Sequence, residues 1–186
     1  MVRIEYLDGE FGEVRDSLYD VKVPELRNPD GERMYKLQLR PHGVGVREPL
    51  RLCIYGTSRT AAVKELIRLT KHAVELSRGT GVTWVATVSE LEPDVWDDDD
   101  GGFGLTLAEL RVRDERALGD GADYLLMWAG WDKDVVVRLR APSREAALEE
   151  FERRCEHARA LDLPAFRLYS TDDMGCRDEL LAELET

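Results

Sequence analysis

The sequence predicts an α+β fold of two similar halves, each with the order strand, strand, strand, helix, strand. A helix-like stretch from Ser143 to Leu163 lies between two strand-like stretches, and part of it recurs upstream at a constant offset of 85 residues. The recurring residues are Ser58, Arg59, Ala61, Ala62, Glu65, Arg68, His72 and Ala73, which match Ser143, Arg144, Ala146, Ala147, Glu150, Arg153, His157 and Ala158. A strand–helix–strand step places its helix on one face of a sheet. We therefore expect a pseudo-duplication with a mostly antiparallel sheet and two main helices on one face.

The first half shows clear strand and helix patterns. Alternating apolar and polar residues predict strands at 2–7, 33–40 and 50–55. Ser58 then stands where a hydroxyl can cap a helix, and apolar residues recur at helical spacing from Val63 to Val74. Gly79 is a residue typical of the position just after a helix. The β-rich stretch 82–88 predicts a strand that returns along the sheet.

An acidic, glycine-rich segment at 93–104 predicts the boundary between the halves. It would separate an N-terminal α+β half, residues 1–92, from a C-terminal α+β half, residues 105–186, although the two could pack as one domain. The C-terminal half has predicted strands at 105–113, 122–128, 134–140 and 165–169. Ser143 caps its main helix, and Thr171-Asp172-Asp173 predicts the start of a short C-terminal helix. The helical matches are residues that many helices use, so common ancestry of the halves stays open.

Composition limits the classes of function. The chain has 186 residues, 43% of them hydrophobic, and a net charge of −12. Membrane spans need about 20 consecutive apolar residues, and the N-terminus lacks the apolar core of a signal peptide. We therefore expect a cytoplasmic protein without a membrane partner. A uniformly acidic surface disfavours nucleic acid, and three cysteines without CxxC spacing disfavour a disulfide framework.

Arginines of the predicted strands share one face. Arg138 and Arg140 alternate with the apolar residues from Val135 to Leu139. If the apolar faces meet the helices, the opposite sheet face is rich in arginine. The candidate partner-binding residues are Arg40, Arg51, Arg111, Arg113, Arg138, Arg140 and Arg167, with Trp128 and Trp131 as aromatic anchors. The alternative is that these arginines pair with Glu5, Glu90 or Glu109 and only keep the face soluble.

Two histidines occupy matching positions in the two predicted helices. On a helical wheel, His72 and His157 lie opposite the apolar stripes, so we expect both to point outward beside Arg68 and Arg153. Such faces would be ordinary solvated surfaces with Glu–Arg pairs. The alternative is that they bind the same group twice or sense pH.

Signals for catalysis and metal binding are weak. The segment Asp98-x-Asp100-Gly101 supplies only a fragment of a calcium loop, because Trp96 stands where the first aspartate belongs. Nucleotide-binding, GxSxG and HExxH motifs do not occur in the sequence. We therefore predict no cofactor, no metal and no catalytic residue.

The leading hypothesis is a non-enzymatic protein-interaction or assembly module that acts through the arginine-rich face. Its partner would be another protein or a second copy of the chain, in which case contacts depend on salt. One alternative is a nucleic-acid-binding protein that uses the same face. The other is an enzyme of unknown class, with a cleft between the halves near His42 or Asp97–Asp100.

Overall fold

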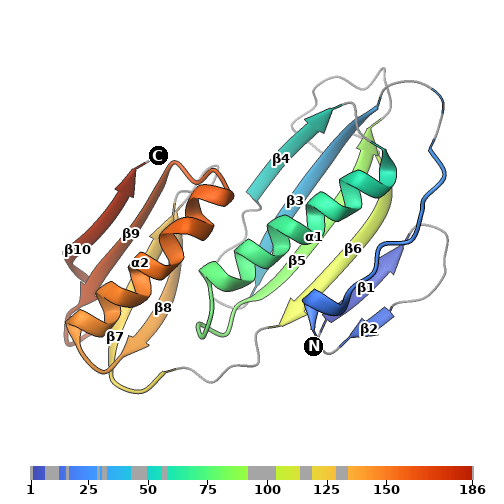
Figure 1. Cartoon of the computed structure of the whole chain (residues 1–186). Helices are drawn as coiled ribbons and strands as arrows, with labels where there is room; N and C mark the ends of the chain where they lie inside the picture. The colour runs from blue at the N-terminus through green and yellow to red at the C-terminus, as the bar shows by residue number, and fades with distance from the viewer. Residues whose placement is uncertain are drawn as a thin grey trace.

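The computed structural model contains two antiparallel sheets that lie side by side, with one long helix on each (Figure 1). It describes residues 2–6, 13–15, 17–28, 30, 33–42, 50–55, 58–91, 104–113, 119–128 and 134–185. The first sheet has the order β2-β1-β6-β5-β3-β4. Its strands are β1 (Val2–Tyr6), β2 (Glu13–Arg15), β3 (Met34–His42), β4 (Leu50–Tyr55), β5 (Thr83–Leu91) and β6 (Leu105–Arg113).

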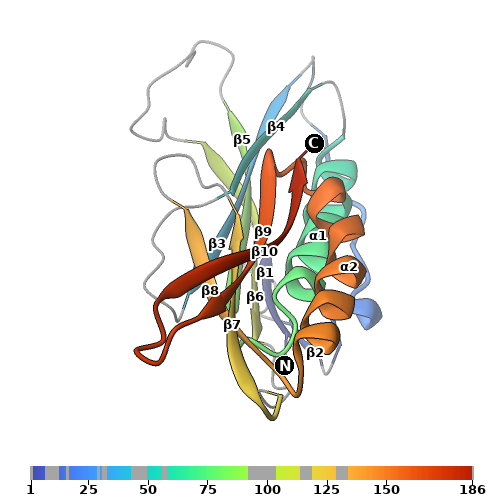
Figure 2. The same ribbon diagram turned by 90° about the vertical axis from the view of Figure 1, so that its left-hand side faces the viewer.

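The second sheet has four strands in the order β10-β9-β7-β8. They are β7 (Ala122–Trp128), β8 (Val135–Ala141), β9 (Ala165–Thr171) and β10 (Arg177–Glu185). The helices α1 (Arg59–Leu76) and α2 (Arg144–Ala160) cover the same side of both sheets (Figure 2). A short 3₁₀ turn, η1 (Leu18–Asp20), precedes β3. The α+β class, the antiparallel pairing and the helices on one face are confirmed.

The two halves repeat one arrangement. In each half a hairpin leads into a helix, the helix returns to a strand beside the first strand of the hairpin, and a last strand pairs outside it. The sets are β3-β4-α1-β5-β6 and β7-β8-α2-β9-β10. The predicted caps are equivalent: Ser58 Oγ accepts from the Ala61 amide at 3.1 Å, and Ser143 Oγ accepts from the Ala146 amide at 3.2 Å. The duplicated pattern is therefore confirmed, and β1 and β2 are additions to the first sheet.

The predicted boundary does not separate the two sheets. The strand expected to open the C-terminal half, β6, pairs with both β1 and β5 in the first sheet. The chain therefore passes from one sheet to the other after Arg113 and before Ala122, not within 93–104. Composition located an acidic segment, but the pairing partner of the strand that follows it depends on contacts distant in sequence.

The predicted C-terminal helix is wrong, because the chain forms strand β10 there. Asp172 Oδ1 accepts from the amides of Met174 at 2.9 Å and Cys176 at 2.7 Å, and Gly175 has a φ of 75°. This tight turn reverses the chain into a hairpin with β9. Aspartate side chains cap turns in the same way as they cap helices, so the residues expected to begin a helix begin a hairpin.

The cores of the two halves meet at tryptophan. The rings of Trp84 and Trp128 stack with centroids 6.3 Å apart, and Trp128 also contacts Phe166 at 6.5 Å. Trp128 is 1% exposed. The prediction of Trp128 as a surface anchor is therefore wrong, since this side chain joins the two cores.

Candidate functional site

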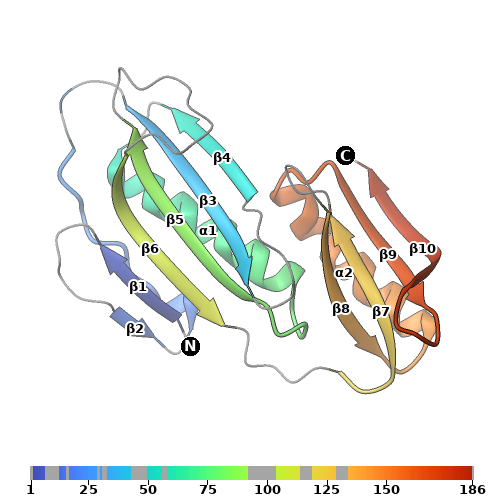
Figure 3. The same cartoon turned by 180° about the vertical axis from the view of Figure 1, so that it is seen from behind.

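The open faces of both sheets lie on the side away from the helices (Figure 3). The predicted arginines are found there, and Arg167 is half-buried while the others are exposed: Arg40, Arg111, Arg113, Arg138 and Arg140. The backbone of Arg51 pairs with Gln38 on β3, and its side chain lies outside the described part of the chain. Trp131 also lies outside the described residues.

In the second sheet these arginines are neutralised by carboxylates. Asp123 accepts from Arg140 Nε at 2.9 Å and lies 3.3 Å from Arg138. Arg167 is paired with Glu183, which stands directly opposite on β10. The alternative of solubilising ion pairs therefore fits this sheet, with partners other than those predicted. Glu90, one of the predicted partners, lies on the helix side, where Arg59 Nε donates to it at 2.7 Å.

In the first sheet positive charge is less compensated. Arg40, Val85 and Arg111 lie in one row across β3, β5 and β6. Arg111 Nε contacts Glu109, a predicted partner, at 3.0 Å. Among the described residues, neither Arg40 nor Arg113 has an ion-pair partner. The two sheets therefore differ in charge, and the cationic surface is concentrated on the first one.

A groove runs along this cationic surface with a volume of about 540 Å³. Its lining comes from the three adjacent strands β3, β5 and β6: Gln38, Arg40, His42, Thr83, Val85, Thr87, Glu109 and Arg111. Among the described residues of this lining, Glu109 is the one carboxylate, and His42 is the one aromatic side chain. The groove thus offers guanidinium groups, hydroxyls and an amide to a ligand, which is suited to recognition of carboxylates.

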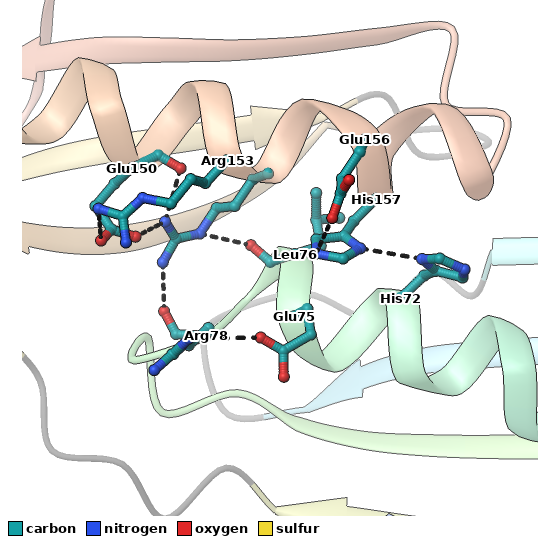
Figure 4. A network of polar contacts seen from close by, with 9 residues as sticks. His72, Glu75, Leu76, Arg78, Glu150, Arg153, Glu156 and His157 are labelled. Atoms are coloured by element: carbon teal, nitrogen blue, oxygen red, sulfur yellow. Dashed lines mark hydrogen bonds and ion pairs between the residues drawn. The ribbon is translucent and has the colours of Figure 1, made fainter. Parts of the chain in front are cut away.

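The helices meet at the two matching histidines (Figure 4). The prediction that both point outward is wrong, because α1 packs against α2 and brings His72 Nδ1 within 3.0 Å of His157 Nδ1. The two residues are 85 positions apart, the offset of the repeat. Contact between equivalent residues is what a two-fold relation between the halves produces. The pKa of His72 is lowered, chiefly by burial and then by the neighbouring His157 and Arg68.

Arg154 connects the halves beside this pair. It is 4% exposed, and its guanidinium donates to Leu76 O at 3.1 Å, Arg78 O at 2.7 Å and Glu150 O at 2.8 Å. Leu76 is the last residue of α1, so Arg154 satisfies carbonyls that the helix end leaves without partners. Sequence reasoning missed this residue. Leu69 occupies the equivalent position in the first repeat. The sequence signal for a special role of Arg154 was therefore a difference between the repeats, whereas the comparison looked for matches.

The remaining predicted sites bring no further chemistry into this arrangement. Within the described ranges, no three histidine, cysteine or acidic side chains gather into a possible metal site. The segment 97–100 lies outside the described residues. None of the described helices is long and apolar enough to cross a membrane. Comparisons with protein-family models, curated proteins and solved structures found no match to the chain.

Proposed function

We propose that the protein is a binding module that holds an acidic segment of a partner protein in the groove of the first sheet. The observation that supports this most is the exposed charge of Arg40 in the groove lining, and of Arg113 on the neighbouring strand β6, which no described carboxylate pairs, in a chain of net charge −12. Solubility does not require positive charge on such a chain. An arginine without a counter-charge retains its capacity for a bidentate bond to a carboxylate.

Two observations favour a peptide over nucleic acid. Single-stranded nucleic acids are held by several aromatic side chains on which successive bases stack, and the described groove lining has no Trp, Tyr or Phe and only one imidazole, that of His42. The net charge of −12 also repels a polyanion at long range. A short acidic segment carries fewer charges and needs only local complementarity.

Binding of a labelled peptide with alternating glutamate and threonine tests the proposal by fluorescence anisotropy. We expect binding at about 50 mM salt that weakens strongly at about 300 mM, since screening shortens the Debye length. Arg40→Glu and Arg111→Glu are each expected to weaken binding about tenfold, equivalent to about 1.4 kcal/mol. Arg159→Glu, an exposed site on α2 on the other side of the molecule, is the matched control.

An equal loss in the control would mean that only net charge acts, and the groove proposal would be wrong. Tighter binding of an oligothymidine of matched length would replace the proposal with the nucleic-acid alternative. Light scattering at low salt separates a foreign partner from a second copy of the chain. If the molar mass of the wild type rises with protein concentration and that of Arg40→Glu stays at the monomer value, the acidic segment belongs to a second copy of the chain.

A further inference from the structure

We infer that the cavity between the two halves is a second site, which binds a small oxyanion such as a phosphate or diphosphate group. The cavity has a volume of about 440 Å³, within the range of sites for small molecules. Its lining joins the end of α1 to β8 and α2 and includes, among the described residues, four arginines and two carboxylates: Arg78, Arg140, Arg153, Arg154, Asp120 and Glu150. It lies on the junction, away from the groove of the first sheet.

The charges around this cavity do not balance. Glu150 contacts two guanidinium groups, those of Arg153 at 2.6 Å and of Arg154. Arg78 lies 3.9 Å from Glu75, a long distance for an ion pair. Among the described lining residues, Arg78, Arg153 and Arg154 thus face two carboxylates, Glu150 and Asp120, which leaves an excess of one positive charge. Arg140 is held by Asp123 at 2.9 Å and is not needed for this excess.

The same three arginines also border a second hollow of about 180 Å³, together with His157 and the carboxylates Glu75, Glu150 and Glu156. Arg78 and Arg153 have side chains 55% and 65% exposed, so their guanidinium groups are accessible to a ligand. Arg154 is buried and held by its carbonyl partners, so it supplies a stationary charge. Guanidinium forks match the oxygens of phosphate in bidentate fashion.

An anion here would contact both halves, since Arg78 follows α1 and Arg153 lies on α2. Binding to the folded junction alone would raise the unfolding temperature of the protein. The size of the cavity suits a free phosphate or a small phosphorylated molecule. A free phosphate and a phosphorylated molecule present the same phosphoryl oxygens, and titration with anions of increasing charge distinguishes them.

Titration of the full chain with inorganic pyrophosphate tests the inference, by calorimetry and by amide NMR shifts. We expect pyrophosphate to bind more tightly than phosphate, chloride at equal ionic strength to have no comparable effect, and shifts to centre on Arg78, Gly79 and Arg153. Arg78→Gln and Arg153→Gln are each expected to weaken binding about tenfold. Arg159→Gln, on an exposed position of the same helix, should bind as wild type does.

Wild-type affinity in both Arg78→Gln and Arg153→Gln would overturn the inference, as would equal responses to pyrophosphate and chloride. Shifts centred on Arg40 and Arg111 would place the anion in the groove instead. Phosphate as tight as pyrophosphate would limit the ligand to a single phosphate group. Because Arg40→Glu should leave pyrophosphate binding intact, failure at the junction is distinguishable from failure of the groove.

Discussion

Replacement of Arg154 by leucine is expected to lower the free energy of unfolding by about 3 kcal/mol, the range found when one partner of a buried polar network is removed. The variant would leave Leu76 O and Arg78 O without the donors at 3.1 and 2.7 Å that they have in the wild type. Glu150 would also lose a charge partner. Leucine is the natural choice because Leu69 occupies the equivalent position in α1. Urea denaturation followed by circular dichroism measures the difference.

Arg153→Leu is the matched control, since Arg153 is the adjacent residue, carries the same charge and also pairs with Glu150. Its side chain is 65% exposed, so the expected loss is below about 1 kcal/mol. Equal losses in the two variants would contradict the role of Arg154 as a connector. So would a more stable Arg154→Leu protein, because apolar packing would then outweigh the polar contacts. If the double variant Arg154→Leu, Glu150→Gln regains stability relative to Arg154→Leu, the loss comes from the unpaired Glu150 carboxylate.

Local signals predicted the repeated elements because local chemistry determines them. Each main helix begins after a serine whose hydroxyl accepts the amide three residues later, and a cap of this kind is visible in sequence. Strand alternation correctly placed Arg40, Arg111 and Arg138 on exposed faces. The alternation of apolar and polar residues does not specify which strands lie on either side. Whether an arginine meets a carboxylate depends on cross-strand register, which is why Arg138 has Asp123 while Arg40 has no ion pair in the described part of the chain.

The errors share a non-local origin. Leu184 stands opposite Phe166 across a hairpin, and that pairing overrides the helical tendency of residues such as Glu183 and Ala182. A single helical wheel placed His72 outward because it cannot represent a second helix on that side. Arg154 resembles an ordinary surface arginine in sequence, and only the position of the α1 carboxyl end makes it a connector.

The histidine contact makes a pH-dependent junction, and His72→Gln is expected to weaken that dependence. Glu156 lies 3.4 Å from His157 Nε2, and the two Nδ1 atoms are close enough for one neutral ring to donate to the other. Protonation of both rings would place two donors and two like charges 3.0 Å apart. Burial, His157 and Arg68 all oppose protonation of His72. Glu156 and Glu65 favour it, but their effect on its pKa is smaller.

The sign follows from the lowered pKa of His72 in the folded protein. Between this pKa and the unfolded value of about 6.5, the unfolded chain binds more protons, so stability falls as pH decreases. The loss reaches at most about 1.4 kcal/mol per pH unit for one group. We expect urea midpoints of the wild type to fall between about pH 7.5 and 5.5, and those of His72→Gln to fall less. Loss of a group whose pKa is changed by folding must change how the urea midpoint varies with pH. The same pH dependence in the wild type and in His72→Gln would therefore show that the histidine pair does not control the junction.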